Sequence, residues 1–133
     1  MYERFVLTLA SVYGMTAVIL GAFGAHALKG KLSPESLVSY ETGVRYQLVH
    51  AVVLLVVVLW QRTSPSPLLV WSGGCMAIGT LLFSGSIYLL ATRAITGLEW
   101  GKVLGPVTPL GGLLLIVGWL LLVVWSVARG RAS

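Results

Sequence analysis

Charge is scarce in this sequence. Only 10% of the 133 residues are charged and 57% are hydrophobic, and the four acidic residues are all glutamates, without one aspartate. A soluble domain of this size covers itself with charge on about a quarter of its residues. The composition therefore excludes a water-soluble globular protein and predicts an integral membrane protein with several spans.

Cysteine and histidine are also nearly absent. Cys75 is the one cysteine, which excludes an intrachain disulfide, and its apolar surroundings predict a buried, inert thiol. With only His26 and His50 beside it, no set of metal ligands is complete, and we expect neither a metal nor another cofactor. The nine basic residues are scattered through the loops without a stripe, which argues against nucleic acid as a partner and indicates contacts with lipid headgroups.

Long apolar runs fill most of the chain. A hydrocarbon core of about 30 Å needs roughly 20 apolar residues in a helix, and four segments meet this requirement, at about 5–25, 44–60, 68–91 and 109–127. The first resembles a secretory signal, with a small-x-small pattern at Ala25, His26 and Ala27, but it is longer than a signal core and is expected to remain as a span. The sequence predicts an all-α, single-domain bundle of four transmembrane helices over residues 1–133, with both termini on one side.

Residues typical of helix N-termini precede the second and fourth spans. Ser33 and Pro34 form an N-cap and first-turn pair, which predicts an amphipathic surface helix leading into the second span. Thr108 and Pro109 repeat the pattern before the fourth span. Gly111 and Gly112 leave that helix start with little side-chain cover, so the alternatives there are close packing and an anion bound to exposed amides.

Small residues recur every three or four positions in the first span. Helix backbones approach closely at such positions in a bilayer. The stripe of Gly14, Ala17, Gly21 and Ala25 therefore predicts a helix-packing face, with another helix of the chain as the favoured partner and self-association as the alternative. Tryptophans near span ends suggest an aromatic belt, at Trp60, Trp71, Trp100 and Trp125, whereas Trp119 is expected to pack or face lipid.

The charges leave the orientation open. Arg4, Arg62, Arg129 and Arg131 fall on the side of the termini, against Lys29, Lys31, Arg45, Arg93 and Lys102 on the other. These numbers are too similar for the positive-inside rule to decide between the two orientations.

Polar residues inside a span are costly and mark candidate sites. The second span holds most of them: Glu41 and Arg45, spaced for an ion pair, and Tyr46, Gln47 and His50, which we expect to face the bundle interior. Ser84 and Tyr88 in the third span, together with His26, are candidates to satisfy them. Thr80 and Ser86 extend the third span's polar seam. An alternative is that His26 and His50 pair as ligands of a haem.

Four motifs occur in order along the chain. They are Gly-Ala-Phe-Gly-Ala-His-Ala-Leu at 21–28, Tyr-Gln-x-x-His-Ala at 46–51, Phe-Ser-Gly-Ser-x-Tyr at 83–88 and Thr-Pro-x-Gly-Gly at 108–112. In these motifs the sequence resembles the small four-helix membrane proteins of the YgdD and YwdK type. The resemblance implies a multi-pass protein of the bacterial cytoplasmic membrane and carries no known activity.

No nucleophilic triad, phosphate-binding loop or acid pair is present in the sequence, so we do not expect an enzyme. The favoured interpretation is a non-catalytic accessory or assembly subunit of a membrane system, whose partners are the lipid bilayer and another membrane protein. The first alternative is a minimal transporter or proton-conducting protein using the polar seam around His50. A haem-binding redox subunit ranks third.

Overall fold

The computed structural model describes residues 1–99 and 101–130, and this part of the chain is helical with short connections. The helices are α1 (Tyr2–His26), α2 (Pro34–Thr63), α3 (Pro67–Ala91), α4 (Arg93–Thr96), α5 (Gly101–Leu104) and α6 (Val107–Gly130). Four long helical segments are apolar enough to cross a membrane, with α5 and α6 forming the last one. The predicted all-α membrane fold is therefore confirmed, whereas the expectations for Trp100 and Arg131 lie outside the described residues.

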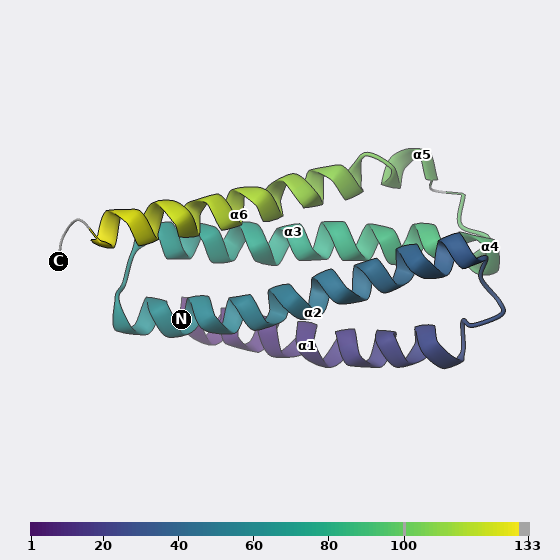
Figure 1. Ribbon diagram of the computed structural model, residues 1–133, viewed down its shortest axis with the longest axis horizontal. Helices are drawn as coiled ribbons and strands as arrows, with labels where there is room; N and C mark the ends of the chain where they lie inside the picture. Colours follow the sequence, from purple (N-terminus) through teal and green to yellow (C-terminus); the bar gives the residue numbers. More distant parts are fainter. Residues whose placement is uncertain (100, 131–133) are drawn as a thin grey trace.

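The four long helices lie side by side in an open row (Figure 1). Each packs against its predecessor, α2 on α1, α3 on α2 and α6 on α3, and α1 makes a smaller contact with α3. Within the described residues no Cα atom of α1 or α2 lies within 8 Å of one in α6. The first turn of α1 and the last turn of α6 lie at the same end of the row.

Helix α2 begins where the sequence predicts. The Ser33 hydroxyl oxygen accepts a hydrogen bond from the Ser36 amide at 3.2 Å, and Pro34 stands in the first turn. The helix then continues without a break to Thr63. The lead-in therefore continues into the second span as one helix, as predicted, and it packs on its neighbours through the buried Tyr40 and Gly43.

Helix α6 begins earlier than predicted. Its first residue is Val107, and the Leu110 amide donates to the Pro106 carbonyl, so Thr108 lies inside the first turn and is not the N-cap. The Thr108 hydroxyl instead lies 2.6 Å from that of Ser86 on α3. This hydrogen bond joins α6 to the end of α3, after the chain has passed through α4 and α5.

The interface between α1 and α2 contains small residues, but only part of the predicted stripe lies in it. Ala17 is buried and Gly21 faces Val44, whereas Ala25 is exposed. Because four residues turn a helix by about 40° more than a full circle, the contact moves to Gly24. A Cβ atom there would lie 2.8 Å from the Tyr40 ring, so only glycine leaves room for that ring.

Glycine also brings α3 and α6 together. A Cβ atom on Gly111 would collide with the Phe83 backbone nitrogen, and one on Gly118 would lie 2.6 Å from the Met76 side chain. The Ser72 hydroxyl donates to the Gly118 carbonyl at 2.8 Å. Close backbone approach and an interhelical hydrogen bond are the means by which helices associate in lipid, and they fix the register of α6 on α3.

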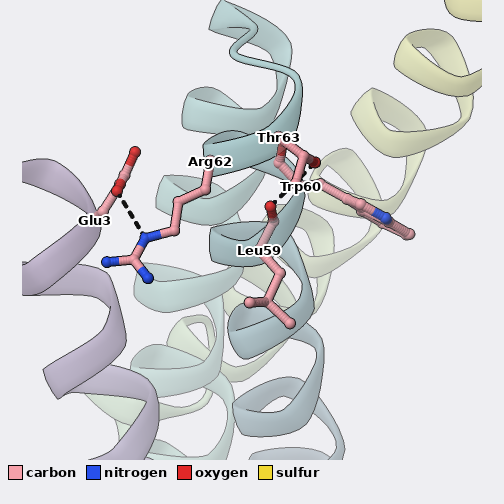
Figure 2. A network of polar contacts seen from close by, with 5 residues as sticks. All are labelled: Glu3, Leu59, Trp60, Arg62 and Thr63. Atoms are coloured by element: carbon pink, nitrogen blue, oxygen red, sulfur yellow. Dashed lines mark hydrogen bonds and ion pairs between the residues drawn. The ribbon is translucent and has the colours of Figure 1, made fainter.

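The end of the row that holds the first turn of α1 carries the ionic and aromatic contacts. Figure 2 shows the Arg62 guanidinium donating from Nε to Glu3 at 3.1 Å, the one ion pair among the described residues. Trp60 and Trp125 have ring centroids 5.2 Å apart, and the Arg129 guanidinium lies 5.5 Å from the Trp125 ring. Both tryptophans therefore lie at span ends, with a cation against the Trp125 ring, where an aromatic belt meets the headgroups.

Candidate functional site

Gln47 is the centre of the buried polar cluster. Its side chain is 6% exposed and connects three helices. The amide nitrogen donates to the Tyr13 carbonyl at 2.9 Å and to the Thr16 hydroxyl at 2.7 Å, both on α1, while its oxygen accepts from the Tyr88 hydroxyl on α3 at 2.7 Å. Gln47 therefore faces the interior, and of the candidate partners Ser84, Tyr88 and His26 it is Tyr88 that bonds to its side chain.

Further hydroxyl groups tie neighbouring helices through backbone carbonyls. Tyr13 donates to Ala77 at 2.8 Å, joining α1 to α3, and Ser84 donates to Gly43 at 2.7 Å, joining α3 to α2. Ser84 therefore bonds to a backbone group and makes no hydrogen bond to the side chains of Gln47 or His50. In hydrocarbon an unbonded polar group is costly, so these bonds stabilise the observed packing.

His50 has both ring nitrogens engaged. Its side chain is 4% exposed; Nδ1 lies 2.7 Å from the Tyr46 carbonyl, and Nε2 lies 3.2 Å from the indole nitrogen of Trp119. A carbonyl only accepts and an indole N–H only donates. The geometry therefore specifies a neutral imidazole with its proton on Nδ1. The Trp119 bond connects α2 to α6, which have no close backbone contact.

Tyr46 lies at the edge of the interior, and the expectation that it is buried is wrong. The residue is 43% exposed and lines a groove whose other lining residues come from α2, α3 and α6. The ring packs against Phe83, with centroids 4.7 Å apart, and stacks on the His50 ring with centroids 6.0 Å apart and an interplanar angle of 26°. We call this the aromatic groove; it has a volume of about 320 Å³, and Trp119 forms its α6 wall.

A second cavity lies on the α1 side of α2. It has a volume of about 200 Å³, and its polar lining comes from Tyr13, Thr16, Gln47, Thr80 and Tyr88. The Thr80 hydroxyl is buried and is the one buried side-chain oxygen or nitrogen without a hydrogen-bond partner in the described part of the chain. This cavity and the aromatic groove share no lining residue. The predicted single seam that faces both Gln47 and His50 is therefore divided into two sites.

Three predicted members lie outside the cluster. His26 is exposed at the end of α1 and does not approach His50, whose nitrogens are bonded elsewhere, so the pair of haem ligands does not form. Glu41 and Arg45 are both exposed, and among residues 1–99 and 101–130 no ion pair joins them. Surface ion pairs of this spacing contribute little, which explains why the spacing alone did not produce one. Within the same residues no group of three or more acidic, histidine or cysteine side chains is placed to hold a metal.

The start of α6 serves packing. Thr108 bonds to Ser86, and Gly111 is buried on α3, while Gly112 faces the Phe83 ring. Pro109 follows within the first turn. These contacts agree with the close-packing alternative predicted for Thr108, Pro109, Gly111 and Gly112.

Tyr13, Thr16 and Trp119 also belong to the polar sites, and the sequence motifs did not predict this. Each is a hydrogen-bonding residue inside an apolar run, which is the signal that could have identified it. Trp119 was assigned to packing or lipid contact, and its ring is indeed partly exposed, but its indole nitrogen satisfies His50. The motifs meet in space in two groups. Gly24, Gln47 and Tyr88 are linked through Tyr40 and Tyr88, and His50, Phe83 and Gly112 line the aromatic groove.

Comparison with known proteins shows similarity to uncharacterised membrane proteins. A Staphylococcus epidermidis UPF0382 membrane protein is 40% identical over 89% of this chain and 91% of its own length. YwdK of Bacillus subtilis is 39% identical over 91% of this chain and 94% of its own, and the inner membrane protein YgdD of Escherichia coli is 35% identical over 98% and 95%. No solved structure matches the chain.

The family model described as "Protein of unknown function (DUF423)" matches residues 20–112, which include all four motifs. Together with the four membrane-length helical segments, these relatives place the chain among multi-pass proteins of the bacterial cytoplasmic membrane. The chain thus belongs to the DUF423 family of membrane proteins.

Proposed function

We propose that this protein is a non-catalytic accessory or assembly subunit of a membrane system. The observation that carries the proposal is the open row of helices. The two outer helices α1 and α6 each pack along one side and leave the other apolar side exposed, as at Met15 and Val18 on α1 and at Leu120 and Val123 on α6. Transmembrane helices associate through packing surfaces of this kind.

The polar interior supports a structural role for the buried side chains. Gln47 and His50, together with the hydroxyls of Tyr13 and Ser84, are bonded within the chain and tie helices together. A general acid or base needs a side chain free to reach a substrate. These side chains are committed to helix contacts instead, which favours the non-catalytic proposal.

Photo-crosslinking tests the accessory role. A benzophenone amino acid is placed at Val18 on α1 or Val123 on α6 in native membranes, with Val52 on the central helix α2 as a matched exposed control. We expect a discrete crosslinked protein from an outer helix and not from Val52. Lipid adducts alone at every position would contradict the proposal.

Proton or solute conduction is the second candidate function. The observation in its favour is the cavity of about 200 Å³ in which the buried Thr80 hydroxyl and the Gln47 cluster occur together. Purified protein in liposomes should then carry a proton flux that is lost in a folded Gln47→Leu variant. Equal flux in empty and protein-containing liposomes would exclude this function.

A further inference from the structure

The Tyr46 hydroxyl differs from every other tyrosine hydroxyl in the chain. The chain has five tyrosines, and those of Tyr2, Tyr13, Tyr40 and Tyr88 all donate hydrogen bonds to other helices. Tyr46 makes ring contacts with Phe83 and His50, but its hydroxyl has no hydrogen-bond partner within the described residues.

The position of Tyr46 in the bilayer makes this hydroxyl costly. Gly14 is the middle residue of α1 and faces Ala51 of α2, which places Ala51 near the midplane. Tyr46 is five residues from Ala51, so at 1.5 Å per residue its backbone lies about 8 Å from the midplane, inside a hydrocarbon half-thickness of about 15 Å. Lipid tails offer no acceptor to this hydroxyl. A molecule that enters the groove with an acceptor atom would supply the missing hydrogen bond.

The walls of the aromatic groove indicate the shape of that molecule. Tyr46 and Phe83 form one side, and the Trp119 ring stands edge-on to His50 at 6.2 Å on the α6 side. Aromatic faces of this kind pack best against a flat ring. The volume of about 320 Å³ is at the small end of the range of about 300–1,000 Å³ for ligand pockets, which suits one ring system and not a whole phospholipid.

The polar chemistry of the groove is limited to one free donor. Both nitrogens of His50 are bonded to Tyr46 and Trp119, so the imidazole offers nothing to a ligand in this geometry. The remaining lining residues Gly112, Leu115 and Ile116 bring no polar side chain. The Ile116 side chain is exposed, so the groove opens toward the lipid. A ligand with an acceptor oxygen on its ring, such as a carbonyl, and with an apolar tail that extends into the bilayer would suit the groove.

We propose that the aromatic groove is a binding site for a lipid-soluble quinone, held by stacking on Tyr46 and Phe83 and by a hydrogen bond from the Tyr46 hydroxyl to a ring carbonyl. The site goes beyond the accessory role and does not depend on it. The proposal concerns binding of the ring and includes no electron transfer.

The test uses the full chain in lipid nanodiscs and a decyl-tailed para-benzoquinone as the probe. Quinones quench tryptophan fluorescence on contact, and Trp119 lies in the groove. We expect saturable quenching that is lost in Trp119→Phe and kept in Trp71→Phe, since Trp71 is an exposed residue of α3 outside the groove. Decylbenzene, which has the ring and tail without the carbonyls, should compete poorly.

Two variants distinguish the contribution of the Tyr46 hydrogen bond to quinone binding from that of the shape of the groove. Tyr46→Phe keeps the ring and should weaken quinone binding about five- to tenfold, the loss expected for one hydrogen bond. Gly112→Leu should fill the groove and abolish binding, whereas Gly74→Leu, which meets nothing within 4 Å of its Cβ, should leave it unchanged. Thermal unfolding identifies any variant that fails to fold, and the Tyr46→Phe result alone then decides. Non-saturable quenching, or equal affinity in Tyr46→Phe and the unmodified protein, would overturn the proposal.

Discussion

Replacing Gln47 by methionine should destabilise the helix packing more than any other conservative change in the chain. Methionine has a similar volume and is apolar, so the change removes the three hydrogen bonds to Tyr13, Thr16 and Tyr88 while keeping the packing. Interhelical hydrogen bonds in membranes are worth about 0.6 kcal/mol each, and at most about 1.7. Three of them correspond to a loss of about 2 kcal/mol in the free energy of unfolding, with an upper bound near 5.

The measurement is reversible unfolding in mixed micelles, with helicity as the signal. Gln61→Met is the matched control, because Gln61 accepts one hydrogen bond, from the Ser66 amide in the turn after α2. It should cost about 0.5 kcal/mol. A double-mutant cycle of Gln47→Met with Tyr88→Phe should show a coupling of about 0.5–1 kcal/mol. A Gln47→Met protein as stable as Gln61→Met, with no coupling to Tyr88, would refute the reasoning.

Three other outcomes follow from the packing and the end contacts. Gly24→Ala should lower the unfolding temperature, because its Cβ atom would lie 2.8 Å from the Tyr40 ring. Gly74→Ala has open space around it and should raise helix stability by up to about 1 kcal/mol. A stabilising Gly24→Ala and a destabilising Gly74→Ala would contradict the glycine contacts. Glu3→Gln should change stability by less than about 0.5 kcal/mol, since the Arg62 pair is exposed, and a larger loss would show that the pair is shielded from water. Cysteines introduced at Tyr2 and Arg129, after Cys75→Ser, should react with an impermeant reagent from the same side of the membrane, and labelling from opposite sides would exclude an even number of spans.

The sequence predicted what depends on hydrophobicity and local helix chemistry. The spans and the start of α2 at Ser33 depend on apolar length and on capping, which are properties of each segment alone. The burial of Gln47 and His50 was also predictable, because lipid cannot satisfy an amide or an imidazole.

The errors concern how helices are rotated against one another. Gly24 and not Ala25 faces α2, because positions four residues apart rotate progressively around the helix axis. Which of them faces the neighbour can be known only from the position of that neighbour. The partner of His50 was missed for a similar reason. Trp119 is 69 positions away in the chain, and only the placement of α6 on α3 through glycines brings its indole to the imidazole.

The open row of helices also sets the order in which the protein can assemble during synthesis. Each long helix packs mainly on the one before it. When a helix leaves the translocation machinery, its packing partner is therefore already in the membrane, and contacts that are close in sequence form fast. Gln47 can bond to its α1 partners as soon as α2 is inserted, and to Tyr88 once α3 is inserted. The bond between His50 and Trp119 needs the last helix. The hydrogen bond between these two side chains can therefore form only after α6, the last helix, has been inserted.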